Sequence, residues 1–171
     1  DIAAAGTSAP DETGRQVLAM SRRFVAVRAD LSSIEPVQRI VDETVAPLGG
    51  LDILVNNAGT IRRADAVDFT EADWDAVMDT NLNSLFNVTK QVIDDMVERG
   101  FGRIVNISSV NGEKGQFGQT NYSAAKAGMH GFTMALAQEV ANKGVTVNTV
   151  SPGYIGTDMV RSIRQDVLDK I

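Results

Sequence analysis

The sequence predicts an α/β fold built on a doubly wound, mostly parallel sheet. Three observations support this class: short apolar runs rich in valine and isoleucine recur along the chain, longer helical patterns separate them, and small or polar residues directly follow the runs. Continuous apolar runs of this kind are typical of strands covered on both faces. Strands that alternate with helices form parallel sheets with right-handed crossovers.

Each element follows from its own stretch of sequence. The apolar runs predict strands at residues 2–5, 24–28, 51–55, 103–107 and 145–150. The helical patterns between them predict helices at about residues 11–20, 33–47, 71–98 and 122–142. Thr70 followed by Asp73 indicates a variant capping box, and Ser32 or Ser33 can cap the preceding helix. We expect a single domain over residues 1–171.

Composition excludes several functional classes. The 16 basic and 22 acidic residues give a net charge of −6 without a basic run, which argues against a nucleic-acid partner. The chain has no cysteine and one histidine, so we expect no disulfide and no metal site. No apolar stretch approaches the ~18 residues of a membrane span. We therefore expect a cytoplasmic protein with no membrane partner.

Tyr122 and Lys126 carry the strongest chemical signal. Four residues apart on an expected helix, they project from the same face. A phenol titrates near ~10 and is a poor proton donor at neutral pH, but a nearby ammonium stabilises the phenolate and makes the pair suitable for acid–base catalysis. Ser109 lies 13 positions earlier and offers a hydroxyl that can hold a carbonyl or alcohol. Such a pair alone is common on solvated helices, so the surrounding motifs decide its meaning.

Those motifs resemble the short-chain dehydrogenase/reductase family over nearly the whole chain. In order, they are Asn56-Asn57-Ala58-Gly59, Asn81, Ile107-Ser108-Ser109, the Tyr122/Lys126 pair, and Ser151-Pro152-Gly153 followed by Thr157. The resemblance implies a Rossmann-like fold and hydride transfer between a nicotinamide cofactor and a carbonyl or alcohol. It also implies a homo-oligomer, tetramer or dimer, because the helices at 71–98 and 122–142 resemble those that form the family's tetramer interface.

The resemblance also implies residue roles. The catalytic residues would be Asn81, Ser109, Tyr122 and Lys126. Asn81 would kink its helix and hold a water for proton relay, and Ser109 would position the carbonyl. The motif spacing selects Ser109, and Ser108 is then structural. The residues implied at the cofactor are Asp30, Asn57, Ala58, Gly59, Tyr122, Lys126, Pro152, Gly153 and Thr157. Simpler interpretations are a helix cap for Asp30, turns at Gly59 and Gly153, and a solvated asparagine at position 81.

The two halves of the chain resemble different members of the family. From about Asn87 onward it resembles acetoacetyl-CoA reductases, which implies reduction of a 3-ketoacyl thioester held by Gln116, Phe117, Gln119 and Tyr154. Residues 61–65 and 69–75 resemble 2-deoxy-D-gluconate 3-dehydrogenases, which implies oxidation of a sugar acid. We favour the reductase, because the substrate-facing loop lies in the second half.

The resemblance implies NADP(H) or NAD(H) as the cofactor. The resemblance of the second half implies NADPH, and that of the first half implies NADH. Residues 6–9 carry neither the acid that holds a ribose 2′-hydroxyl nor the base that holds a 2′-phosphate.

The family's glycine-rich phosphate turn does not precede the first expected strand, and the chain ends before the family's last elements. We therefore expect a truncated member of the family. A catalytically silent fragment without cofactor binding is the alternative. We expect Met129, Phe132, Met134 and Leu136 to serve helix packing. His130 lies among them, and we expect no catalytic role for it.

Overall fold

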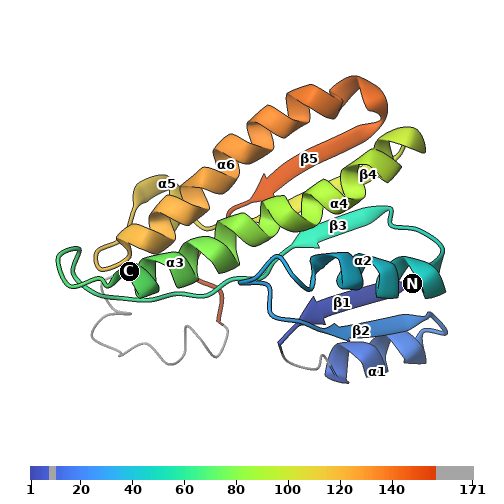
Figure 1. Cartoon of the computed structure of the whole chain (residues 1–171), viewed down its shortest axis with the longest axis horizontal. Helices are drawn as coiled ribbons and strands as arrows, with labels where there is room; N and C mark the ends of the chain where they lie inside the picture. The colour runs from blue at the N-terminus through green and yellow to red at the C-terminus, as the bar shows by residue number, and fades with distance from the viewer. Residues whose placement is uncertain (8–10, 157–171) are drawn as a thin grey trace.

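The structure is a computed structural model that describes residues 1–7 and 11–156. Its strands form two parallel sheets, β1-β2 and β3-β4-β5. The carboxyl ends of the strands point toward the same side of the molecule (Figure 1). The predicted parallel α/β class is confirmed. The strands are β1 Ile2–Gly6, β2 Phe24–Arg28, β3 Ile53–Asn56, β4 Gly102–Ile107 and β5 Val145–Val150.

The helices agree with the sequence prediction except in the middle of the chain. The expected helix at 71–98 consists of α3, a π-helical turn and α4, and the short helix α5 was not expected. The helices are α1 Asp11–Ala19, α2 Val37–Leu48, α3 Glu71–Met78, the π turn Asp79–Asn83, α4 Ser84–Glu98, α5 Asn111–Lys114, α6 Thr120–Val140 and a 3₁₀ turn Ala141–Lys143.

The two predicted helix caps have different outcomes. The cap at Thr70 is confirmed, because its hydroxyl oxygen accepts a hydrogen bond from the Asp73 N–H at 3.1 Å. The cap by Ser32 or Ser33 is wrong, since α2 begins later and Pro36 occupies its N-cap without a side-chain bond.

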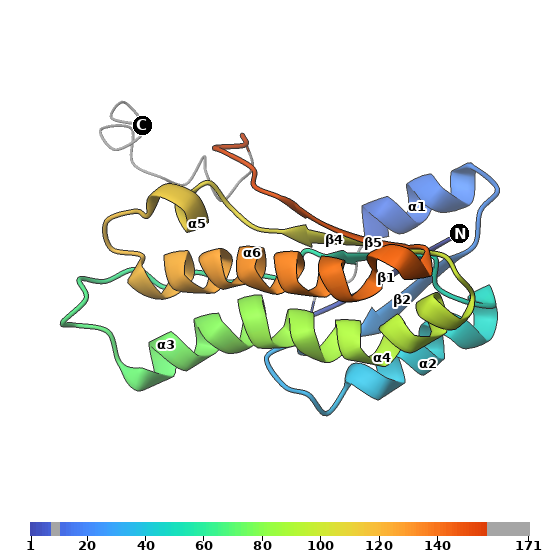
Figure 2. The ribbon, with the colours of Figure 1, turned by 90° about the horizontal axis from the view of Figure 1, so that it is seen from above.

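Helices cover the two sheets differently. Both ribbon views place α1 and α2 on opposite sides of β1-β2, whereas α4 and α6 lie on one face of β3-β4-β5 (Figures 1 and 2). Ile53 and Val55 of β3 are 58% and 53% exposed. The expectation that strands are covered on both faces is therefore wrong for β3-β4-β5 within the described residues. Because successive side chains of a strand point to opposite faces of the sheet, these strands have one face packed against helices and one face that is open.

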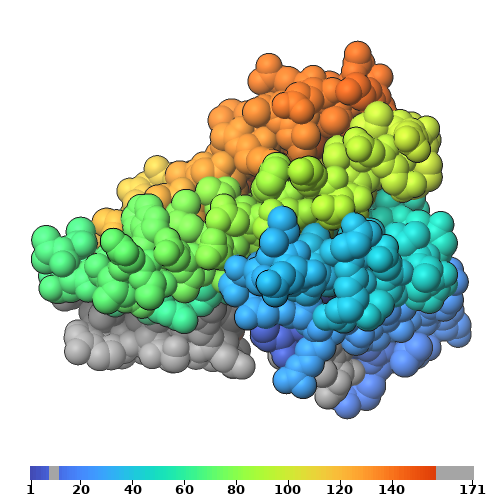
Figure 3. All heavy atoms as spheres, viewed as in Figure 1, coloured from blue at the N-terminus to red at the C-terminus, as the bar shows by residue number. Residues whose placement is uncertain are grey.

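The main hydrophobic core lies between α4, α6 and the strands β4 and β5. Burying each of its larger side chains contributes about 1.5–3 kcal/mol. A smaller core joins β2 to α2, and α2 also packs against α4, as Figure 3 shows on the outer surface. Of the two methionines expected to pack on α6, Met129 is buried, but Met134 is 62% exposed, so its expected packing role is wrong. The main core comprises Val92, Met96, Ile104, Val140, Val145 and Val147.

No helix among the described residues is both long and apolar enough to span a membrane.

Candidate active site

Asn81 interrupts the long helical segment from within. It lies in the π turn between α3 and α4 and is completely buried. Its amide Nδ2 donates to the carbonyls of Val77 at 2.8 Å and Thr60 at 2.9 Å. No donor in the described part of the chain reaches Asn81 Oδ1. Single π turns inside helices occur frequently at functional sites, and here the turn leaves one buried acceptor free.

Lys126 is a buried cation on α6. It is 4% exposed, and its Nζ donates to the Ile107 carbonyl, at the end of β4, at 2.7 Å. The same Nζ lies 5.6 Å from the centroid of the Tyr122 ring. Burial lowers the pKa of Lys126 from 10.5 to about 8, because the charged form loses its hydration. At neutral pH the side chain is therefore still mostly charged, and it lies beside the phenol.

Gly59 approaches both Asn81 and Lys126. A Cβ built on Gly59 would lie 2.8 Å from Asn81 Oδ1 and 3.7 Å from Lys126 Nζ. Any side chain at this position would therefore fill the approach to both polar groups. Three segments that are far apart in the sequence meet at this point, where Gly59 is exposed while Asn81 and Lys126 are buried.

Two neighbouring serines follow β4 and have different surroundings. Ser108 is buried, and its hydroxyl donates to the Lys126 carbonyl at 2.8 Å. The Ser109 hydroxyl oxygen accepts from the Asn111 N–H at the start of α5, at 3.1 Å. The Val110 N–H donates to the carbonyl of Pro152, also at 3.1 Å, so the segments that follow β4 and β5 lie side by side. Ser109 is thus the more accessible hydroxyl at this strand end.

The residues expected at the substrate differ in their surroundings. Tyr154 donates to Gln116 Oε1 at 3.4 Å, which brings these two side chains together. Phe117 is 85% exposed, whereas Gln119 is 6% exposed and accepts from the Asn111 amide at 3.1 Å. Gln119 therefore faces the interior, and contact of these four residues with a substrate stays a prediction.

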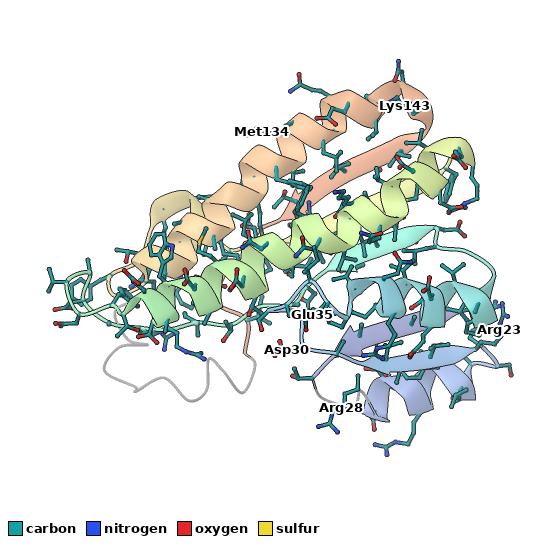
Figure 4. All side chains as sticks on the ribbon, viewed as in Figure 1. Arg23, Arg28, Asp30, Glu35, Met134 and Lys143 are labelled. Carbon is teal, nitrogen blue, oxygen red and sulfur yellow. The ribbon has the colours of Figure 1, made fainter. Side chains whose placement is uncertain are left out.

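Asp30 lies at a second location, past the carboxyl ends of β1 and β2. It helps to line a pocket of about 660 Å³, and Figure 4 shows Arg28, Asp30 and Glu35 gathered there. The N–H and the hydroxyl of Ser32 both donate to Asp30 Oδ1 and hold the pKa of that carboxyl below its ordinary value. The pocket is lined by Thr7, Arg28, Ala29, Asp30, Ser33, Glu35, Pro36 and Arg39.

These features fit the two ends of a nicotinamide dinucleotide. The pocket at Asp30 and the Gly59 approach are the two places at this edge where the resemblance predicts the adenosine end and the reacting end, and both contacts stay predictions. Between them, Asn57 and Ala58 follow the carboxyl end of β3. Ligands of open parallel sheets bind along this edge. Gly153 also has open space beside it, while the expected contact of Thr157 lies outside the described residues.

The sequence analysis missed a buried polar network behind this site. Asn106 is completely buried in β4, where its Oδ1 accepts from Asn56 at 2.9 Å and its Nδ2 donates to Thr133 at 2.9 Å. Thr149 of β5 donates to the Thr133 hydroxyl at 2.7 Å. The network thus ties β3, β4 and β5 to α6. An asparagine inside the apolar run at 103–107 was the available signal.

A parallel α/β fold with a tyrosine and a buried lysine at its carboxyl edge defines a class of nicotinamide-dependent oxidoreductases. The family model described as short chain dehydrogenase matches residues 2–168. The chain therefore belongs to the short chain dehydrogenase family, and the family resemblance seen in the sequence is confirmed.

Three relatives illustrate the range of similarity. An acetoacetyl-CoA reductase of Cupriavidus necator is 60% identical over 99% of this chain and 70% of its own length. Nodulation protein G of Azospirillum brasilense is 58% identical over 90% of this chain and 62% of its own length. A 2-dehydro-3-deoxy-D-gluconate 5-dehydrogenase of Escherichia coli is 39% identical over the whole chain and 70% of its own length. Similarity to an acetoacetyl-CoA reductase thus extends through both halves.

Proposed function

We propose that this oxidoreductase reduces the keto group of a short 3-ketoacyl thioester, acetoacetyl-CoA. Two relatives named acetoacetyl-CoA reductase, at 60% and 56% identity, support this substrate class. The observation that carries the chemistry is the meeting of Gly59, Asn81 and Lys126 beside the ring of Tyr122. Buried ionisable groups with a shifted pKa cluster at functional sites, and Lys126 is such a group.

Each side chain has one task in this proposal. A bound nicotinamide supplies the hydride to the keto carbon. The Ser109 hydroxyl donates a hydrogen bond to the substrate oxygen, and Tyr122 transfers its proton to that oxygen as negative charge develops. Lys126 stabilises the phenolate that remains. The free Oδ1 of Asn81 accepts from the water that resupplies the proton.

The assay is the reduction of acetoacetyl-CoA by the intact chain and by Tyr122→Phe. This variant keeps the ring and removes the proton donor, so we expect turnover to fall by at least about 10²-fold. Circular dichroism and urea unfolding would show that the fold is retained. Near-normal activity of Tyr122→Phe would contradict the assignment. Turnover of a keto sugar acid without turnover of acetoacetyl-CoA would favour the activity named for the Escherichia coli relative.

Within the same proposal the cofactor is NADPH. Arg28 and Arg39 both line the pocket at Asp30. Arg39 is engaged, since it donates to the Arg28 carbonyl at 2.8 Å and pairs with Glu43 at 3.2 Å. The Arg28 guanidinium has no carboxylate within ion-pair distance in the described part of the chain. A free arginine at the adenosine end favours a ribose 2′-phosphate.

Calorimetric titration with NADPH and NADH tests this choice. We expect Arg28→Gln to weaken NADPH binding about tenfold or more and to leave NADH binding unchanged. Arg22→Gln is the matched control, because it removes an exposed arginine outside the pocket. Equal loss for both cofactors would contradict a phosphate contact. Absence of binding by either cofactor would favour the silent-fragment alternative.

The proposal includes a cytoplasmic homo-oligomer that assembles through α4 and α6. Phe86 on α4 and Met134 on α6 are 50% and 62% exposed, so both helices carry a large apolar side chain that such an assembly would cover. Sedimentation of the wild type and of the double variant Phe86→Ser/Met134→Ser tests this surface. We expect an oligomer for the wild type and a smaller species for the variant.

A further inference from the structure

His130 is the single histidine of the chain and lies on α6, one turn beyond Lys126. Its Nε2 lies 3.0 Å from the Ser108 hydroxyl and 3.4 Å from the Ser151 hydroxyl. Ser108 directly follows β4, and Ser151 directly follows β5. One ring nitrogen therefore contacts the ends of both strands from the helix packed against them.

The hydrogen bonds of Ser108 determine the direction of this contact. A serine hydroxyl has one hydrogen, and Ser108 donates it to the Lys126 carbonyl at 2.8 Å. Toward His130, the Ser108 oxygen can therefore only accept. With this assignment, Nε2 carries the hydrogen, and its second, longer contact with Ser151 is also a donation. We therefore take the ring as the Nε2–H tautomer.

Backbone bonds link the two strand ends to each other. The Ser108 N–H donates to the Val150 carbonyl at 2.8 Å, and Val110 donates to Pro152. The Ser108 hydroxyl and the Lys126 ammonium connect the end of β4 to α6, and the His130 ring contacts the residues that follow both β4 and β5. Ser108 is 5% exposed, so water cannot easily replace the lost donor.

We propose that His130 is a positioning residue for the active site. Its Nε2–H holds the segment that carries Ser109, and the segment that carries Pro152, in register with the helix that carries Tyr122. This inference rests on the proposed function for the roles of Ser109 and Tyr122. The contact of His130 with Ser108 and Ser151 does not depend on that function. Small displacements of reacting groups reduce rates strongly, so a donor outside the reaction centre can control turnover.

Nuclear magnetic resonance tests the contact without substrate or cofactor. A chain labelled with ¹⁵N in histidine has a single ring to detect. We expect a directly observed, slowly exchanging Nε2–H proton resonance that is lost in the Ser108→Ala/Ser151→Ala variant. A hydrogen on Nδ1, or a ring proton that exchanges too fast to detect, would overturn the proposal.

Three variants test the positioning. His130→Gln places an amide N–H near the original Nε2, whereas His130→Asn is too short to reach and His130→Leu has no donor. In the chain without ligands, the amide resonances of Ser109 and Tyr122 should shift in the His130→Leu and His130→Asn variants. In the His130→Gln variant, they should lie close to their wild-type positions. Equal shifts in all three variants, or none in any, would overturn the proposal.

Kinetics give a second measurement of the same three variants. We expect kcat for acetoacetyl-CoA to fall about tenfold in the His130→Leu and His130→Asn variants, with KM for the cofactor nearly unchanged. In the His130→Gln variant, kcat should return to nearly the wild-type value. Equal kcat for the glutamine and leucine variants would also overturn the inference. If the wild type itself shows no turnover, the proposed function fails, while the resonances still decide whether His130 positions these segments.

Discussion

Replacement of Lys126 by methionine should change the pH dependence of stability in a direction that the structure determines. Lys126 is 4% exposed, and burial lowers the pKa of its ammonium from 10.5 to about 8. At about 1.4 kcal/mol per pH unit, this difference is worth about 3 kcal/mol. Methionine has a similar length, is apolar and carries no charge into the interior.

The sign follows from proton linkage. Between about pH 8 and pH 10.5, the unfolded chain holds the lysine proton and the folded chain does not. The cost of burying the charge is therefore fully present below pH 8 and disappears as the pH rises toward 10.5. Relative to the methionine variant, the wild type should gain about 3 kcal/mol of unfolding free energy over this range.

At pH 7 the methionine variant should be the more stable protein. Removing the charge gains about 3 kcal/mol, and losing the hydrogen bond to the Ile107 carbonyl costs about 1–1.5 kcal/mol, so the net gain is about 2 kcal/mol. Activity should be lost at the same time. Under the proposed function, the buried ammonium lowers stability in exchange for its role beside Tyr122.

Urea unfolding of both proteins at pH 7 to 10.5 measures the difference directly. Lys143→Met is the matched control, because it removes an exposed ammonium from the last turn before β5, where no charge is buried. A stability difference between the wild type and Lys126→Met that stays flat with pH, or that moves against the wild type as pH rises, would refute this reasoning.

Two further substitutions test the packing around the site. Gly112→Ala should destabilise the fold by about 1–3 kcal/mol and lower activity, because its Cβ would lie 2.8 Å from the Lys126 backbone carbon and push α5 away from α6. Urea unfolding measures the loss of stability, and turnover measures the loss of activity. An unchanged unfolding midpoint would contradict the close approach. Asn106→Leu should cost about 1–3 kcal/mol, because it removes one acceptor from the half-buried Asn56 amide and one donor from the buried Thr133 hydroxyl. A loss below about 0.5 kcal/mol in urea unfolding would show that the network is dispensable.

Much of the fold was predictable because its signals are local. The strands at 24–28 and 145–150 were predicted with the bounds that the structure has, since short apolar runs with polar ends need no distant information. The π turn was different. Only the family resemblance indicated an irregular helix at Asn81, because the turn depends on side-chain bonds to Thr60 and Val77 rather than on periodicity. The open face of β3-β4-β5 also escaped prediction, because an apolar run does not show which faces are covered.

The sequence by itself determined the order of the elements, the family and the pairing of Tyr122 with Lys126, because these depend on residue type and on spacing within a single segment. Only the tertiary structure decided how deeply Lys126 is buried, how closely Gly59 approaches it, and which hydroxyls His130 contacts. These properties arise where segments distant in the chain pack together. Desolvation and hydrogen-bond direction exist only after that packing, so no local pattern contains them.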